Sequence, residues 1–412
     1  ASSDEYTPLD PGPVVREAER RAREAIDREA RRHGMARREF LRTAGASAIV
    51  LASLAACTDE SRRARSETTA AGTFDVDETA TSDLDAAADA FDADGFVMDV
   101  QTHFVDPDRN AGAFGRSFRQ AACGEDNWKR CFARDRYLDL VFADSTTTIA
   151  VLSALPVVDG ESPLATEVML DAIERASESG RGGRVLMQAP VFPATGPLDA
   201  ALDQMSAIAA TLPVRAWKTY THSPDAYRLD DPRGEAMIVH AVEVGVPHIS
   251  VHKGIADGSP AASPEDIGPA ATAHPDVTFV VYHSGWESSV TETSATDGEG
   301  VDRLIRSVES AGIGPGGNVY AELGSTWFNL SRDPEQAGHV LGKLLRSLGP
   351  ERILWGTDSI WYGSPQGQID AFRAFTISDE ARERYGYPPL DDDAKARILG
   401  LNAAELYGVP VR

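Results

Sequence analysis

The feature that most constrains the fold is a series of eight short apolar runs separated by amphipathic stretches. The runs occupy residues 96–101, 148–155, 184–189, 214–218, 247–252, 278–283, 319–323 and 352–356. Most intervals are about 30 to 40 residues, the length of one strand, one helix and two loops. Helical patterns fill the gaps at residues 165–177, 198–210, 233–244, 301–311 and 335–348. Eight such units in one domain predict an α/β fold, a (β/α)8 barrel over residues 91–412.

The first 57 residues carry the parts of an export signal. Arg37 and Arg38 precede a mildly apolar stretch at residues 43–56, and the segment ends Leu54-Ala55-Ala56-Cys57. Paired arginines before a short apolar run are typical of a twin-arginine leader, and the final residues resemble a lipobox. The run is too short and too rich in small residues for a membrane-spanning helix. We therefore predict an exported cell-envelope lipoprotein with its lipid on Cys57.

Composition separates the next segment from the barrel. Residues 58–90 are rich in Ser, Thr, Ala and Asp, which predicts a disordered tether. In an exported protein Cys123 and Cys131 are positioned to close a disulfide, the alternative being two free buried thiols. No CxxC pair indicates a zinc-thiolate site.

The net charge of −24 excludes nucleic acid and anionic membrane surfaces as partners. Membrane contact is expected only through the lipid anchor. The expected partner is a small-molecule substrate, and a homodimer is left open.

Polar residues converge where the predicted strands end. Three histidines and one aspartate reach the same barrel face: His103, His252, His283 and Asp358. Neutral imidazole and carboxylate are good ligands for one divalent metal ion, with zinc first and manganese or iron as alternatives. A coordination position left open by the protein would accept water or substrate.

Five motifs in order resemble the amidohydrolase-related branch of the amidohydrolase superfamily, which includes decarboxylases similar to aminocarboxymuconate semialdehyde decarboxylase. They are "MDVQTHF", "ISVHKG", "FVVYHSGW", "RILWGTDSIWYG" and "ILGLNAAELYGV". The resemblance implies a distorted (β/α)8 barrel with His103, His252 and Asp358 as metal ligands. It also implies that Asp358 manages protons and that His283 is an acid/base group.

Gln101 departs from the family pattern, which usually places His at that position. An amide oxygen is a weaker donor to a transition metal than imidazole. Some relatives carry Glu there, so the position accepts an oxygen ligand. The resemblance therefore implies metal binding of reduced affinity.

Residues near the strand ends indicate how substrate would be held. The family resemblance makes Lys218 either a carboxylated lysine that bridges two metals or a group that binds a substrate carboxylate or pairs with Glu322 or an Asp. Aromatic side chains after several strands favour a ring-containing substrate. The candidate substrate-binding residues are Lys218, Tyr220, Trp286, Trp327 and Trp361.

Three functions fit this sequence. The first is a metal-dependent hydrolase of an amide, lactone or related carbonyl, in which a metal-bound water attacks and Asp358 or His283 manages the proton. The second is a non-oxidative decarboxylase of an aromatic or unsaturated acid that uses the same residues. The third is a catalytically silent barrel that acts as a binding lipoprotein.

Overall fold

The computed structural model describes residues 11–65, 70–91, 95–111, 125–157, 162–222, 225–255 and 259–411. Eight parallel strands form one sheet in sequence order from β2 to β9. The strands are β2 (Met98–Thr102), β3 (Ile149–Ser153), β4 (Val185–Pro190), β5 (Val214–Tyr220), β6 (His248–His252), β7 (Thr278–Tyr282), β8 (Val319–Glu322) and β9 (Ile353–Leu354). Each lies within or overlaps one of the eight predicted runs.

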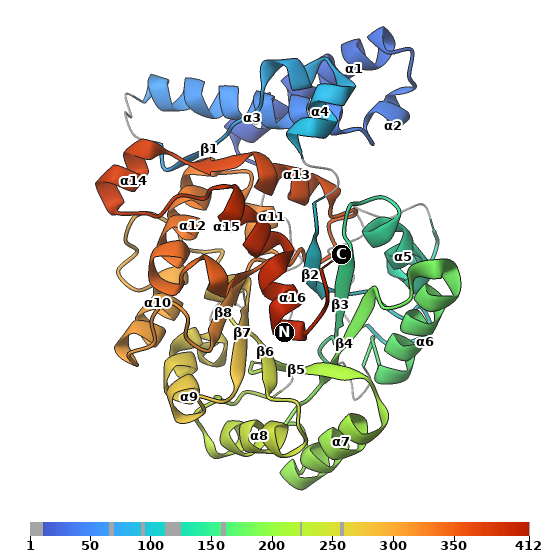
Figure 1. Ribbon diagram of the computed structural model, residues 1–412, viewed down its shortest axis with the longest axis vertical. Helices are drawn as coiled ribbons and strands as arrows, with labels where there is room; N and C mark the ends of the chain where they lie inside the picture. The colour runs from blue at the N-terminus through green and yellow to red at the C-terminus, as the bar shows by residue number, and fades with distance from the viewer. Residues whose placement is uncertain are drawn as a thin grey trace.

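The sheet closes between its first and last strands. Because β9 is short, closure runs through the residues that follow it. Val100 N donates to Trp355 O at 3.0 Å, and Asp358 N donates to Gln101 O at 2.9 Å. Figure 1 shows the resulting ring of strands. The predicted (β/α)8 barrel is confirmed.

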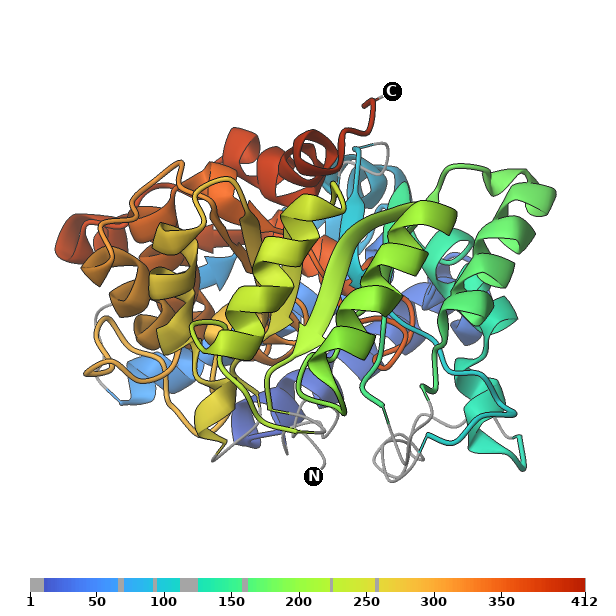
Figure 2. The same cartoon turned by 90° about the horizontal axis from the view of Figure 1, so that it is seen from below.

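Helices surround the strands on the outside of the barrel (Figure 2). They are α5 (Arg134–Phe142), α6 (Thr166–Ala176), α7 (Leu198–Thr211), α8 (Pro232–Glu243), α9 (Ile267–Ala273), α10 (Val301–Ser310), α12 (Pro334–Leu348) and α13 (Gln366–Ala374). Local sequence fixes several starts: Asp231 accepts the N–H groups of Arg233 and Gly234 at the start of α8.

The N-terminal end of the barrel is closed by the last helix, α16 (Asn402–Tyr407). Gln188 Nε2 donates to Tyr407 Oη at 2.6 Å from inside the barrel. Tyr407 packs with Met98, Val100 and Val280, all of which are buried. With this end filled, the opposite end, where the strands finish, is left for a site.

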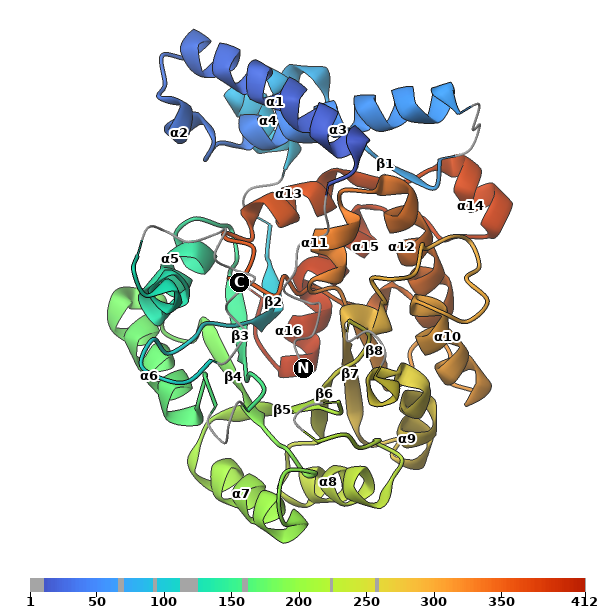
Figure 3. The ribbon, with the colours of Figure 1, turned by 180° about the vertical axis from the view of Figure 1, so that it is seen from behind.

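The N-terminal segment folds against the barrel as a helical layer beside α13 (Figures 1 and 3). It contains α1 (Pro13–Arg32), α2 (Arg37–Phe40), α3 (Ala44–Ala64) and α4 (Leu84–Ala90). Ser47 Oγ on α3 donates to Asp370 Oδ2 on α13 at 2.6 Å. The apolar stretch that we interpreted as part of an export signal therefore forms a packed helix in the full chain.

The segment predicted as a disordered tether is ordered where it is described. Residues Gly72–Phe74 form β1, which pairs antiparallel with β10 (Phe375–Ile377). The ring centroids of Phe74 and Phe375 lie 5.6 Å apart. The segment has few large apolar residues, but the strand ladder and Phe74 place them in the core. The predicted boundary of the folded domain at residue 91 is therefore too late.

Cysteine positions bear on the lipid and disulfide predictions. Cys57 is a buried free thiol within α3. Cys131 is disulfide-bonded, and Cys123 lies outside the described residues. Among the helices in the described ranges, none combines the length and apolar character needed to cross a bilayer.

Candidate active site

One half of the site forms where β2 meets the loop after β9. His103 Nδ1 lies 2.7 Å from Ser153 O, and because a carbonyl only accepts, Nδ1 carries the hydrogen. The ring stacks on Trp361 with 5.9 Å between centroids. His103 Nε2 then presents its lone pair 3.2 Å from Asp358 Oδ1. Two acceptor atoms at this distance need a proton or a cation between them.

Asp358 is held as an anion by hydrogen-bond donors. Its Oδ1 accepts from Gln101 Nε2 at 3.2 Å and from Trp361 Nε1 at 3.1 Å. Its Oδ2 accepts from Ser325 Oγ at 2.6 Å, and the same Oγ lies 2.8 Å from Tyr362 Oη. Three donors on a buried carboxylate stabilise its charged form.

The other half of the site is a cluster of imidazoles at the ends of β5 to β7. The His252 ring lies 4.6 Å from the rings of His222 and His283 and 5.2 Å from that of Tyr220. His283 Nδ1 lies 2.6 Å from Gly324 O and therefore donates to it.

A buried ammonium group accompanies the imidazoles. Lys218 Nζ is 3.3 Å from the ring centroid of Tyr282 and 4.7 Å from that of Tyr220. This half of the site carries a cation and several nitrogen atoms.

Gly324 connects the two halves, because a Cβ there would lie 2.2 Å from Gln101 Oε1. Left-handed φ values of 53° to 62° occur at residues that carry or flank the site: His283, Ser284, Ser325 and Asp358. Such strained backbone persists where surrounding contacts over-determine it, and it is common at functional sites.

Two buried carboxyl groups hold the strand ends in place. Asp99 accepts from Gln101 N and Thr357 N, both at 3.1 Å, and from Thr357 Oγ1. Burial raises the pKa of Asp99 to about 8. Glu322 accepts from His283 N at 3.0 Å and Gly324 N at 2.5 Å, and burial raises its pKa to about 7.

Comparison with known proteins identifies the family. Residues 98–409, which include the strands and helices around this site, match the amidohydrolase family. The chain belongs to the amidohydrolase family.

Solved structures share the fold at low identity. A TIM-barrel protein from Bordetella bronchiseptica has a TM-score of 0.51 and 16% identity, covering 76% of this chain and 99% of its own. The 5-carboxyvanillate decarboxylase of Novosphingobium aromaticivorans has a TM-score of 0.50 and 13% identity, covering 76% and 96%. No match was found among curated proteins.

The amidohydrolase barrel brings most of the predicted site residues into these two groups. Gln101, His103, Asp358 and Trp361 meet in the first group. Lys218, Tyr220, His252 and His283 lie in the second.

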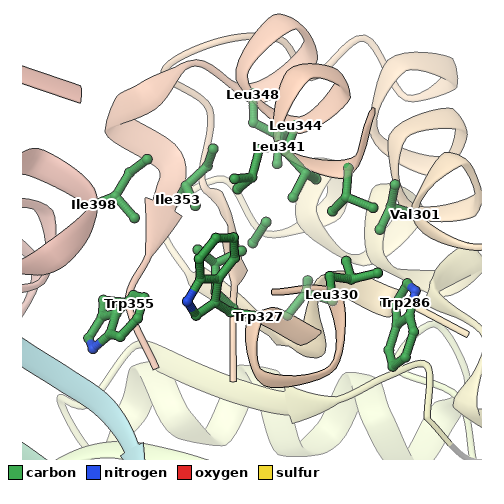
Figure 4. Close-up of a cluster of buried hydrophobic side chains, with 14 of the residues drawn as sticks. Trp286, Val301, Trp327, Leu330, Leu341, Leu344, Leu348, Ile353, Trp355 and Ile398 are labelled. Carbon is green, nitrogen blue, oxygen red and sulfur yellow. The ribbon is translucent and has the colours of Figure 1, made fainter. Parts of the chain in front are cut away.

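Two predicted aromatic residues lie elsewhere. Trp327 packs against Phe372 and Phe375 in the core behind β8, as Figure 4 shows in part, and its Nε1 donates to Gln368 O at 2.9 Å. It therefore does not face the site. Trp286 lies at the margin of the same core and lines a separate cavity.

Sequence reasoning missed Ser325 and Tyr362, which support Asp358. Neither belongs to a recognised donor pattern. The one available signal is position, since Ser325 follows β8 directly and Tyr362 follows the "GTDS" motif. Side-chain partners across strands cannot be read from a single stretch of sequence.

The amidohydrolase fold implies a metal, and the donor atoms test that implication. Across the described ranges, no three His, Cys, Asp or Glu side chains lie together as a metal-binding group. His103 Nε2 and Asp358 Oδ1 do face each other, and Gln101 Oε1 is buried with no hydrogen-bond partner there. One imidazole, one carboxylate and one amide oxygen fit a weakly held divalent cation. Zinc and His252 as a ligand remain predictions.

Replacing Gln101 tests this assignment. We expect Gln101→His to bind Mn²⁺ or Zn²⁺ about tenfold more tightly or better, because imidazole is the stronger donor. Gln101→Leu, which has no donor, should bind more weakly than the wild type. Isothermal titration of protein stripped with a chelator measures all three affinities. Equal affinities would show that residue 101 is not a ligand.

Proposed function

We propose that the protein is a non-oxidative decarboxylase of a carboxylic acid attached to an aromatic ring or unsaturated carbon. A structural neighbour with this chemistry supports the choice: the 5-carboxyvanillate decarboxylase was solved with manganese and 4-hydroxy-3-methoxy-5-nitrobenzoic acid. The observation that carries the proposal is the environment of Asp358.

The donors around Asp358 favour proton delivery over activation of water. Both carboxylate oxygens already accept hydrogen bonds, from Gln101, Trp361 and Ser325. A carboxylate stabilised in this way is a poor general base for a water molecule. It is instead a good counter-charge for a proton on the facing His103 Nε2, 3.2 Å away.

Decarboxylation uses that proton directly. The proton moves from His103 Nε2 to the ring carbon that carries the carboxylate, forming a C–H bond. The C–C bond to the carboxylate then breaks, its electron pair returns to the ring, and carbon dioxide leaves. Solvent restores the proton on His103, and Asp358 compensates the charge throughout.

The imidazole half would bind and orient the acid. Lys218 supplies a buried positive charge, and His252 and His283 supply hydrogen-bonding nitrogens beside it. The aromatic walls exclude water, which favours conversion of a carboxylate into neutral carbon dioxide. A divalent cation on His103, Asp358 and Gln101 would supply positive charge for substrate oxygen atoms.

Hydrolysis of an amide or lactone is the second candidate. The facing acceptors His103 Nε2 and Asp358 Oδ1 favour it, since a cation between them could also acidify water. In that case His283 would manage the proton, because Asp358 is already occupied by donors.

Isotope labels distinguish the two reactions. We screen hydroxybenzoic acids, lactones and cyclic amides against the metal-loaded protein, in D₂O and separately in H₂¹⁸O. We expect carbon dioxide and a product with one deuterium on the carbon that lost it. Uptake of ¹⁸O without carbon dioxide would establish the hydrolase instead. Neither reaction, together with no metal binding, would favour the silent binding barrel.

A histidine variant ties the activity to this site. We expect His103→Gln to lower kcat by about 10²- to 10⁴-fold, the range lost with a general acid. The control is His274→Gln, which changes a histidine on the outer surface that pairs with Glu235 at 2.9 Å. Its kcat should match the wild type. A fully active His103 variant would remove this residue from the mechanism.

A further inference from the structure

A cavity of about 340 Å³ lies beside the ends of β7 and β8, adjoining the proposed decarboxylation site. Its lining includes Trp286, Asn329 and Arg332, together with the first residues of α1. Trp286 N donates to His283 O at 2.8 Å, and Asn329 Nδ2 donates to Ser325 O at 2.9 Å. The cavity therefore shares its walls with residues that position the catalytic groups.

Arg332 holds an uncompensated positive charge in this cavity. Its guanidinium lies 4.4 Å above the ring of Phe328, which stacks at 3.6 Å on Tyr362. Within the described ranges Arg332 makes no ion pair or hydrogen bond. Burial lowers the pKa of Arg332, as expected for a cation with reduced access to water. Buried arginines are normally paired, so this one calls for an anion.

The nearby carboxylates are already committed to other groups. Asp333 caps α12 by accepting from Gln336 N at 3.3 Å and Gln336 Nε2 at 2.8 Å. Glu335 accepts from Ala71 N at 2.7 Å and lies 3.4 Å from His339 Nε2. These contacts keep both acids away from Arg332 in this structure.

Two more polar atoms of the lining have no partner. Trp286 Nε1 and Asn329 Oδ1 are buried and make no hydrogen bond with any described residue. Leaving a buried donor or acceptor unsatisfied costs about 1–3 kcal/mol, so such groups usually have a ligand or water. A cation, an N–H donor and an amide around one cavity form a polar subsite.

We propose that Arg332 is a specificity-determining residue that binds a second acidic group of the substrate. Guanidinium is planar and matches a carboxylate with two parallel hydrogen bonds. The substrate class is then a dicarboxylic acid, with one carboxylate beside Lys218 and the imidazoles and the other on Arg332. This inference rests on the proposed function for the identity of the first carboxylate.

Binding of two probes tests the proposal without turnover. We measure isothermal titration of benzene-1,3-dicarboxylate and of benzoate with the wild type and with Arg332→Gln. The wild type should bind the dicarboxylate at least tenfold more tightly than benzoate. Arg332→Gln should lose that preference and leave benzoate binding unchanged, and Arg332→Lys should keep part of it. The control is Arg346→Gln, an arginine stacked on Tyr387 outside the cavity, which should bind as the wild type does.

The results separate this proposal from the decarboxylase assignment. Equal binding of the two probes by the wild type, or tight dicarboxylate binding by Arg332→Gln, overturns the Arg332 subsite. If the preference depends on Arg332 but no acid releases carbon dioxide, the subsite stands and the decarboxylase proposal fails. For an acid that is turned over, Arg332→Gln should raise KM about tenfold or more with little change in kcat. A lowered kcat with unchanged KM would also overturn the subsite.

Discussion

Replacing Asp358 with asparagine should lower kcat by about 10³-fold while the protein remains folded. Asparagine keeps the size of the side chain but removes the charge that faces His103 Nε2 at 3.2 Å. The proton on His103 then loses its counter-charge, and any cation loses its one anionic ligand. Steady-state rates of carbon dioxide release measure the effect, with circular dichroism to verify folding.

Two neighbouring variants show whether the charge itself is responsible. Ser325→Ala and Trp361→Phe each remove one donor to Asp358 but leave the carboxylate in place. Each should cost much less than Asp358→Asn, because the remaining donors still hold the anion. Equal losses in all three variants would mean that the geometry of the loop, not the charge of Asp358, limits the reaction.

Replacing Lys253 with alanine should lower the free energy of unfolding by about 3–5 kcal/mol. Lys253 Nζ lies 2.8 Å from Asp266 Oδ2, and both side chains are buried. The variant leaves Asp266 as a buried charge without its partner. Chemical denaturation of the wild type and the variant gives the difference.

A double variant identifies the cause of that loss. Lys253→Ala combined with Asp266→Ala should be less destabilised than Lys253→Ala alone, because it leaves no orphaned charge. The exposed pair of Arg20 and Glu24 provides a surface comparison, and Arg20→Ala should leave stability nearly unchanged. A Lys253 variant as stable as the wild type would show that water reaches Asp266. Lys253 would then follow His252 in sequence without stabilising the fold.

The barrel could be predicted because its strands are buried on both sides. A strand such as Thr278–Tyr282 reads as an apolar run, and its neighbours recur at the spacing of strand, helix and loops. Strand order places His103, His252, His283 and Asp358 at one end. Those positions follow from backbone topology, which the pattern of apolar residues determines.

The remaining features depend on side-chain direction and packing across the chain. Trp327 and Trp361 both follow barrel strands, yet one fills the core and the other donates to Asp358. No local pattern distinguishes them. The layer formed by α1 and α3 was also missed, because small residues such as Ser47 and Ala48 pack well against a partner helix without forming a strong apolar run.

The location of Cys57 within α3 makes maturation and folding mutually exclusive events. Cleavage at the predicted lipobox would cut α3 between Ala56 and Cys57, so the peptidase must reach the chain before this helix packs or after it has opened. An uncleaved chain keeps α1 over the Arg332 cavity, whereas a processed chain loses Pro13 to Val15 from the cavity wall. The timing of one proteolytic event would thus decide how open the entrance to the Arg332 cavity is.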